Sequence, residues 1–235
     1  MASTTLGDNG GATGAAPQGI ADAPAEQSRP ARSEQSRSVL TRAALVAAAR
    51  DLFGSQGYHA TGTTDIVAKA AVTRGALYHH FGNKEGLFEA VYRLVAQEMS
   101  DFSINATLPL SGQTWTRVVA TVRANLSFVA LHRDAQRILL IDGPAVFGWA
   151  RWRELHSECR LGGWITTIDM LVDQGVIADL PREPLAHLFM AMLDDAGMSL
   201  AYADDAELAL SDVIRCLEAL FSGLLVASAA KPASG

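Results

Sequence analysis

The chain of 235 residues has only two cysteines, Cys159 and Cys216, which are too few for a disulfide framework or a cysteine zinc site. It also lacks any run of about 18 apolar residues, so the sequence predicts no transmembrane helix. The N-terminus has no basic start followed by an apolar stretch and is therefore unlike a secretory signal. From these absences we expect a cytoplasmic protein that contacts no membrane.

Positive charge is scarce too, and the net charge of −6 argues on its own against a nucleic-acid partner. The charge is unevenly spread, however. Residues 37–93 hold seven Lys or Arg against four Asp or Glu, whereas residues 94–235 hold ten against seventeen. A basic segment attached to an acidic body points to a polyanion partner at one end of the protein.

Sustained strand alternation with β-branched residues is missing, and apolar residues recur at helical spacing throughout, so we predict an all-α fold of about nine helices. Residues 1–36 are rich in Ala, Gly, Ser and Pro and are predicted to be a disordered tail. Residues 37–82 are predicted to form a helix-turn-helix domain, and residues 83–227 a helical ligand-binding and dimerisation domain in which one helix stops at Gly143-Pro144. Residues 228–235 are predicted to be a flexible tail.

Residues 61–81 predict two short helices joined by a tight turn at Ala71, which is a helix-turn-helix signature. Either Thr61 or Thr63 is expected to cap the first helix, and Thr73 the second.

The second helix carries a polar face on which Arg74 and Tyr78, four residues apart, lie together with Gly75 and His79. Because glycine has no side chain, this face has a bare centre that lets the backbone approach a DNA major groove, where Arg74 can bind guanine through two hydrogen bonds. Phosphate contacts are expected from the helix starts, including Lys84. The residues predicted to bind DNA are Thr63, Thr64, Thr73, Arg74, Gly75, Ala76, Tyr78, His79 and Lys84.

Other interpretations of this segment stay open. Tyr78 could belong to the core instead of the exposed face. His79 and His80 are adjacent, so on a helix they diverge by about 100° and do not chelate one metal ion together. We expect neither a metal nor a cofactor.

The stretch "GYHATGTTDIVAKAAVTRGALYHHFGNKEGL" resembles the DNA-binding segment of the TetR (tetracycline-repressor-like) family, and the match covers about residues 41–95. The family pattern runs Gly-Tyr, a threonine, Ile-Ala, Ala-Gly-Val-Ser, Gly-Thr-Leu-Tyr, His-Phe and Lys-Glu-x-Leu. Two departures are Ala76, which replaces the usual threonine, and Ala71, which replaces the turn glycine. Positive φ at a non-glycine residue costs on the order of 1 kcal/mol, so we expect a slightly strained turn.

The resemblance implies a homodimer that binds a near-palindromic operator and is released from it by a small molecule. The last two predicted helices carry wide apolar stripes with the small residues Ala191, Ala196, Gly197 and Ala201. They are expected to form the dimer contact through residues 184–227, or else only to close the monomer core. Activation of transcription is the alternative to repression within this class of DNA-binding proteins.

Tryptophan and methionine are abundant in the C-terminal part, where most are expected in the core and some around an apolar or aromatic ligand. Asp194 and Asp195 interrupt an apolar helix and need partners if buried, and Arg160 is a candidate on the same reasoning. The candidate ligand-binding residues are Phe128, Trp149, Trp152, His156, Trp164, Met190, Asp194 and Asp195.

Catalysis has little support, because no Gly-x-Ser-x-Gly elbow is present. His156 and Cys159 are three residues apart, but no third metal ligand is evident. We therefore expect a regulator and no enzyme. The alternative is a helical small-molecule-binding protein or enzyme with an incidental helix-turn-helix.

Overall fold

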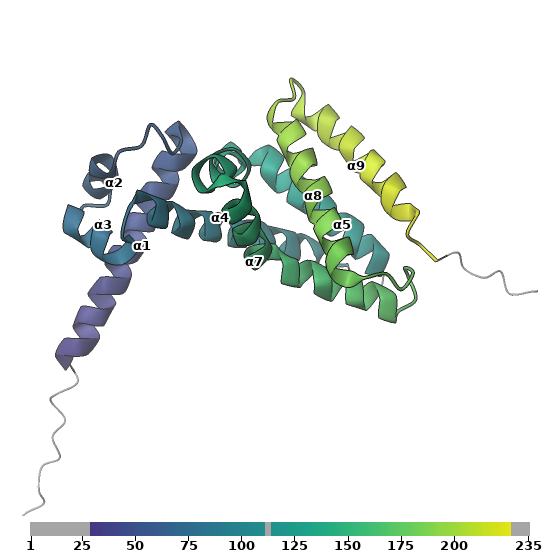
Figure 1. The fold of residues 1–235 in the computed structure, drawn as a ribbon, viewed down its shortest axis with the longest axis horizontal. Helices are drawn as coiled ribbons and strands as arrows, with labels where there is room; N and C mark the ends of the chain where they lie inside the picture. The colour runs from purple at the N-terminus through teal and green to yellow at the C-terminus, as the bar shows by residue number, and fades with distance from the viewer. Residues whose placement is uncertain (1–28, 111–113, 227–235) are drawn as a thin grey trace, which may run out of the picture. The chain divides into compact units, whose positions relative to one another are not determined.

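The computed structural model describes residues 29–110 and 114–226, with side chains from residue 34 onward. These residues form nine α-helices and one π-helical segment, and no strand is found among them (Figure 1). The elements are α1 (Arg29–Gln56), α2 (Thr63–Lys69), α3 (Arg74–Phe81), α4 (Lys84–Thr107), α5 (Thr114–Leu131), α6 (Arg133–Gln136), η1 (Arg137–Asp142), α7 (Gly143–Asp173), α8 (Arg182–Ala201) and α9 (Ala206–Ser222). The all-α prediction is confirmed, and no described helix is long and apolar enough to cross a bilayer.

The chain divides into two compact units, Met1–Ser38 and Val39–Gly235. In the first unit only the beginning of α1 is described. Because α1 starts at Arg29, the prediction of disorder is wrong for residues 29–36, while residues 1–28 and the predicted tail over 228–235 lie outside the described residues. The Ala, Arg, Glu and Gln residues between positions 29 and 36 extend an existing helix at little cost in free energy.

The helix-turn-helix is formed by α2 and α3, which pack on α1 and α4 around a shared core. Ile66 of α2 and Leu77 of α3 are fully buried, together with Phe53 of α1 and Phe88 of α4. Ala71 has a φ of 53°, the only positive value at a non-glycine residue within the described ranges, so the expected strain at this turn is confirmed.

Capping of the two helices agrees with the prediction for α3 only. The Thr73 hydroxyl accepts a hydrogen bond from the Ala76 N–H at 3.3 Å, as expected. The prediction for α2 is wrong, because Gly62 occupies the N-cap position and its N–H donates to Asp65. Thr61 is instead buried, and its hydroxyl donates to the Gly57 carbonyl oxygen at 2.7 Å.

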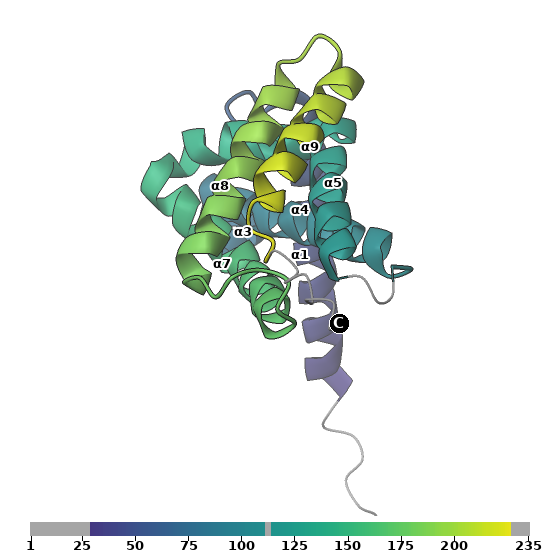
Figure 2. The ribbon, with the colours of Figure 1, turned by 90° about the vertical axis from the view of Figure 1, so that its right-hand side faces the viewer.

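The C-terminal part is a layered helical body in which α4 contacts α5, α7, η1 and also α3. Helices α8 and α9 lie side by side and both pack on α5 (Figure 2). Pro144 does not end the helical stretch, contrary to the prediction. It falls in the first turn of α7, where a backbone N–H would have no intrahelical acceptor, so proline is tolerated there. The break comes at Gly148, with φ 73° and ψ 157°.

Candidate nucleic-acid interface and ligand cavities

One face of α3 is free of intramolecular packing. Thr73, Arg74, Gly75, Tyr78 and His79 are exposed. We call these five residues the α3 rim. Since nothing in the described chain covers the rim, it is available to another molecule.

Arg74 and Tyr78 form a pair on this rim. The Arg74 Nη2 donates to the Tyr78 hydroxyl at 3.3 Å, and the guanidinium carbon lies 5.6 Å from the ring centroid. The hydrogen bond from Arg74, followed by its charge, lowers the pKa of Tyr78. Tyr78 is 42% exposed, so it does not belong to the core. The pair therefore presents a cation and a phenol at a fixed spacing.

Glycine at position 75 is not demanded by the fold. A Cβ built on Gly75 would meet only the Thr73 Oγ1, at 3.9 Å, which is ordinary van der Waals contact. Gly86 is different, because a Cβ there would lie 2.2 Å from the Phe81 carbonyl oxygen. Glycine is therefore required at position 86 by the close packing at the junction of α3 and α4. At position 75, in contrast, packing within the chain does not require a glycine.

The other predicted DNA-binding residues surround the rim. Thr63 is half-buried and Thr64 exposed at the start of α2, and Ala76 is half-buried on α3. Lys84 is half-buried at the start of α4, with its Nζ 4.1 Å from the centroid of the Tyr58 ring. Desolvation by burial lowers the pKa of Lys84.

His80 is half-buried, and its ring packs against the rings of His79 and Phe81 at centroid distances of 5.2 and 6.1 Å. No cluster of three or more His, Cys, Asp or Glu side chains that could hold a metal occurs in residues 29–110 and 114–226.

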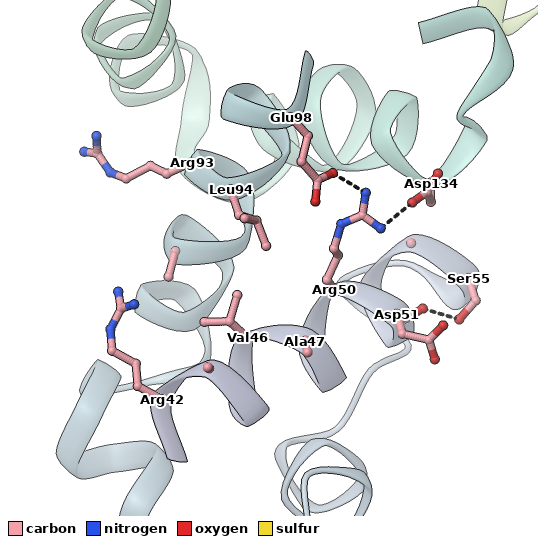
Figure 3. A pocket seen from close by; sticks show the side chains of 13 residues that line it. Arg42, Val46, Ala47, Arg50, Asp51, Ser55, Arg93, Leu94, Glu98 and Asp134 are labelled. Atoms are coloured by element: carbon pink, nitrogen blue, oxygen red, sulfur yellow. Dashed lines mark hydrogen bonds and ion pairs between the residues drawn. The ribbon is translucent and has the colours of Figure 1, made fainter. Parts of the chain in front are cut away.

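Arg50 ties α1 to the C-terminal body. Its guanidinium lines a groove between α1 and α4, where Nη2 donates to Glu98 at 2.5 Å and Nη1 to Asp134 at 2.9 Å (Figure 3). In addition, the Tyr58 N–H donates to Asp142 of η1 at 2.9 Å. Helix α1 and the loop that follows it are therefore joined to α4, α6 and η1 by directional contacts.

A cavity of about 370 Å³ lies between η1, α7 and α8, and we call it the tryptophan cavity. Six of the eight candidate ligand-binding residues line it: Trp149, Trp152, His156, Met190, Asp194 and Asp195. Trp149 follows the break at Gly148 and is 65% exposed, with its ring centroid 5.1 Å from that of Trp152.

The remaining two candidates lie elsewhere. Trp164 lines a second cavity and packs edge-on against Phe189 at 5.6 Å. Phe128 lines neither the tryptophan cavity nor this second cavity, and packs against Phe102 and His132, at 5.5 and 4.4 Å between centroids.

A buried polar cluster separates the two cavities. Asp194 Oδ1 lies 3.1 Å from His156 Nε2 and 3.3 Å from Arg160 Nη1, and Tyr92 of α4 places its hydroxyl 2.8 Å from His156 Nδ1. Arg160 Nη2 also donates to Asn125 at 3.4 Å. Arg160 Nη1 also lies 3.1 Å from His156 Nε2, so this ring nitrogen faces both the guanidinium of Arg160 and the carboxylate of Asp194. Burial, the largest influence, lowers the pKa of His156, and Asp194 has the partners that its burial requires.

The second cavity, of about 310 Å³, lies between α4, α5 and α7, and sequence reasoning missed it except for Trp164. We call it the hydroxyl cavity because five side-chain hydroxyls line it: Ser100, Ser103, Thr107, Thr121 and Thr167. The available signal was the spacing of Ser103 and Thr107, which puts both hydroxyls on one face of a largely apolar helix.

Comparisons with family models and with solved structures all point to the same family. The family model "Bacterial regulatory proteins, tetR family" matches residues 45–91, and "Tetracyclin repressor-like, C-terminal domain" matches residues 115–224. A TetR-family transcriptional regulator from Pectobacterium atrosepticum is 36% identical in sequence, and its crystal structure matches 82% of this chain and 98% of that chain with a TM-score of 0.71. A protein described as a TetR-family transcription regulator from Shewanella sp. PV-4 is 26% identical, with 80% and 99% covered and a TM-score of 0.63.

Among curated proteins, the transposon Tn10 TetC protein of Escherichia coli is 26% identical over 148 residues, which are 63% of this chain and 74% of that protein. The A-factor receptor protein of Streptomyces griseus is 40% identical over 58 residues, or 25% of this chain and 21% of that protein.

Proposed function

The chain belongs to the TetR family of bacterial transcriptional regulators, and from that premise we propose that it is a homodimeric repressor released from its operator by a small molecule. Residues 37–82 bind the DNA, and residues 83–227 bind the effector and the second copy. The protein acts in the cytoplasm as a regulator and not as an enzyme.

The exposed α3 rim is the observation that carries this proposal. A recognition helix must enter the major groove with its reading side chains uncovered, and Arg74, Gly75 and Tyr78 meet that requirement. Arg74 reads a guanine, Tyr78 and His79 reach phosphates, and Thr63, Thr64 and Lys84 hold the backbone on either side. In a dimer the two copies of α3 bind successive grooves about 34–36 Å apart.

The dimer forms through residues 184–227. Leu188 and Tyr202 on or next to α8, and Leu208 and Leu220 on α9, are more than half exposed, an arrangement that favours burial against a second copy. Gly197 does not contribute to this contact as expected. Gly197 is buried, and a Cβ on it would lie 2.9 Å from Leu140 of the same chain, so this small residue serves packing of α8 on η1.

The tryptophan cavity is a candidate effector site because it joins aromatic and methionine surface to a few polar groups. The tryptophan cavity and the hydroxyl cavity both adjoin the polar cluster. Tyr92 of α4 is hydrogen-bonded to His156 of this cluster, and α4 also contacts α3. An effector that prefers one arrangement of this cluster lowers operator affinity, and linkage requires the operator to lower effector affinity equally, typically by about 1–3 kcal/mol.

The direct test is a DNA-binding titration of the full chain with the DNA upstream of its own gene. We expect affinity to fall steeply with ionic strength and to be lost in the Arg74→Ala, Tyr78→Ala double variant. Arg133→Ala, an exposed arginine on α6, is the matched control and should bind as the unmodified protein does. Equal binding by the double variant and the control, or no binding at low salt, would refute the proposal and favour a helical small-molecule-binding protein.

A further inference from the structure

The ionisable groups that line the hydroxyl cavity carry charge of one sign. Arg117 and Arg160 contribute guanidinium groups, and no carboxylate lines the cavity within the described residues. Burial raises the pKa of the Cys159 thiol, so this third ionisable group stays neutral. Arg117 has no ion pair within residues 29–110 and 114–226, so its charge is available to a ligand.

Arg160 is held with its side chain only 10% exposed. Its contacts with Asp194 and His156 engage Nη1, its bond to Asn125 engages Nη2, and Nε has no partner in the described part of the chain. A guanidinium has five N–H donors, so two remain for a ligand at this cavity, one of them on Nε. Asp194 balances the charge of Arg160, and Arg117 then leaves the cavity with an excess positive charge.

Four of the five hydroxyl groups, those other than Ser100, present oxygen lone pairs and not protons. Ser103 donates to the Met99 carbonyl oxygen at 2.9 Å, and Thr107 donates to that of Ser103 at 3.0 Å. Thr121 and Thr167 donate in the same way to carbonyl oxygens four residues earlier, each at 2.9 Å. Because these protons are used within the helices, the hydroxyl oxygens can accept from a donor on a ligand.

The apolar remainder of the lining includes Met99, Ile104 and Trp164. A volume of about 310 Å³ is at the lower end of the ~300–1,000 Å³ range of ligand pockets. The cavity therefore offers guanidinium donors, hydroxyl acceptors and an apolar wall to one small molecule.

We propose that the hydroxyl cavity binds a small hydroxylated organic acid, whose carboxylate is held by Arg160 and Arg117 and whose hydroxyl donates to the Ser and Thr oxygens. This inference rests on the proposed function, places the effector in the hydroxyl cavity instead of the tryptophan cavity, and assigns its chemical class. A carboxylate at Arg160 competes with Asp194 for the same guanidinium. Binding thus perturbs the polar cluster that reaches Tyr92 on α4.

The test is calorimetric titration of the full chain with 4-hydroxybenzoate, its neutral amide 4-hydroxybenzamide, and the cation 4-hydroxybenzylamine. We expect the acid to bind at least about tenfold more tightly than the amide, which corresponds to about 1.4 kcal/mol, and the amine not to bind. Benzoate should bind more weakly than 4-hydroxybenzoate because it lacks the donor for the Ser and Thr oxygens.

Three arginine variants locate the site. Arg160→Gln should abolish binding of the acid, but it also leaves Asp194 without its guanidinium, so the exposed Arg117→Gln is the deciding variant and should weaken binding by about tenfold. Arg123→Gln is the matched control, because Arg123 is an exposed arginine of the same helix that does not line the cavity.

Equal affinities of the acid, amide and amine, equal effects of Arg117→Gln and Arg123→Gln, or no binding of any probe at millimolar concentration would each overturn the inference. Operator binding is measured on the same samples. Intact DNA binding without acid binding refutes this inference alone. Acid binding without DNA binding refutes the proposed repressor and not the site.

Discussion

Replacing Gly75 by alanine separates what the fold needs from what DNA binding needs. Gly75 is the second residue of α3, where Gly→Ala gains up to the roughly 0.5–1 kcal/mol of stability typical of a helix interior, because alanine loses less backbone entropy on folding. The new Cβ would lie 3.9 Å from Thr73 Oγ1 and meet no closer atom, so no steric cost offsets this gain. We expect the free energy of unfolding to rise by up to about 0.5–1 kcal/mol, and Tm by up to roughly 1–4 °C.

The same methyl group should weaken operator binding. If the backbone of α3 approaches the base edges at Gly75, the added carbon holds the helix away and lengthens the contacts of Arg74. Loss of one base contact costs about 1–3 kcal/mol, so we expect affinity to fall by roughly 5- to 150-fold. The assays are urea unfolding followed by circular dichroism and fluorescence anisotropy with labelled operator DNA.

Gly162→Ala provides the control for this experiment. Gly162 is also an exposed helical glycine, and a Cβ there meets nothing within 4 Å. It should bring a similar gain in stability with unchanged DNA affinity. If Gly75→Ala binds the operator as tightly as Gly162→Ala does, the α3 backbone does not approach DNA at this point and the docking geometry is wrong.

Four further outcomes are expected. Ala71→Gly should stabilise the protein by up to about 1 kcal/mol in urea unfolding, because relief of about 1–2 kcal/mol of left-handed strain exceeds the chain-entropy cost of about 0.4–1 kcal/mol. Gly86→Ala should destabilise it by more than about 1 kcal/mol, since its Cβ would lie 2.2 Å from a carbonyl oxygen; unchanged stability would contradict that geometry. Stability should fall as pH drops below about 6.5, because burial lowers the pKa of His156 in the folded state and the unfolded chain binds the proton more tightly; a His156→Gln variant with the same pH slope would exclude this residue as the cause. Leu208→Glu should convert the dimer to monomer in sedimentation experiments, and a dimer that persists would place the interface elsewhere.

The helix-turn-helix was predictable because its signals are local. The i, i+4 spacing of Arg74 and Tyr78 fixes their pairing on any helix, and the cap at Thr73 follows from residue type. The cap of α2 was not predictable in the same way, since Asp65 and the hydroxyl of Thr61 both seek backbone partners there. Thr61 donates to Gly57 because the preceding turn brings that carbonyl within reach, a fact set by tertiary structure.

The ligand-binding candidates show where sequence reasoning ends. Large apolar residues identify a helical body, but helical periodicity does not tell a core position from a cavity wall. Phe128 and Trp152 are both large aromatic residues in predicted helices, yet Phe128 packs on Phe102 whereas Trp152 borders the tryptophan cavity. The hydroxyl cavity depends on three helices meeting, so its serines and threonines resemble surface residues until the fold is known.

The polar cluster gives a physical reason for an effector to reach the DNA-binding domain. A buried ion pair is a costly arrangement whose members need every bond they make, so a ligand that takes one guanidinium donor from Asp194 leaves the others to rearrange. His156 links that event to Tyr92, which lies inside α4 between the body and α3. Tyr92→Phe should therefore preserve effector binding while reducing its effect on operator affinity, and a variant with undiminished coupling would show that the signal travels by another route, such as the contacts of Arg50 with Glu98 and Asp134.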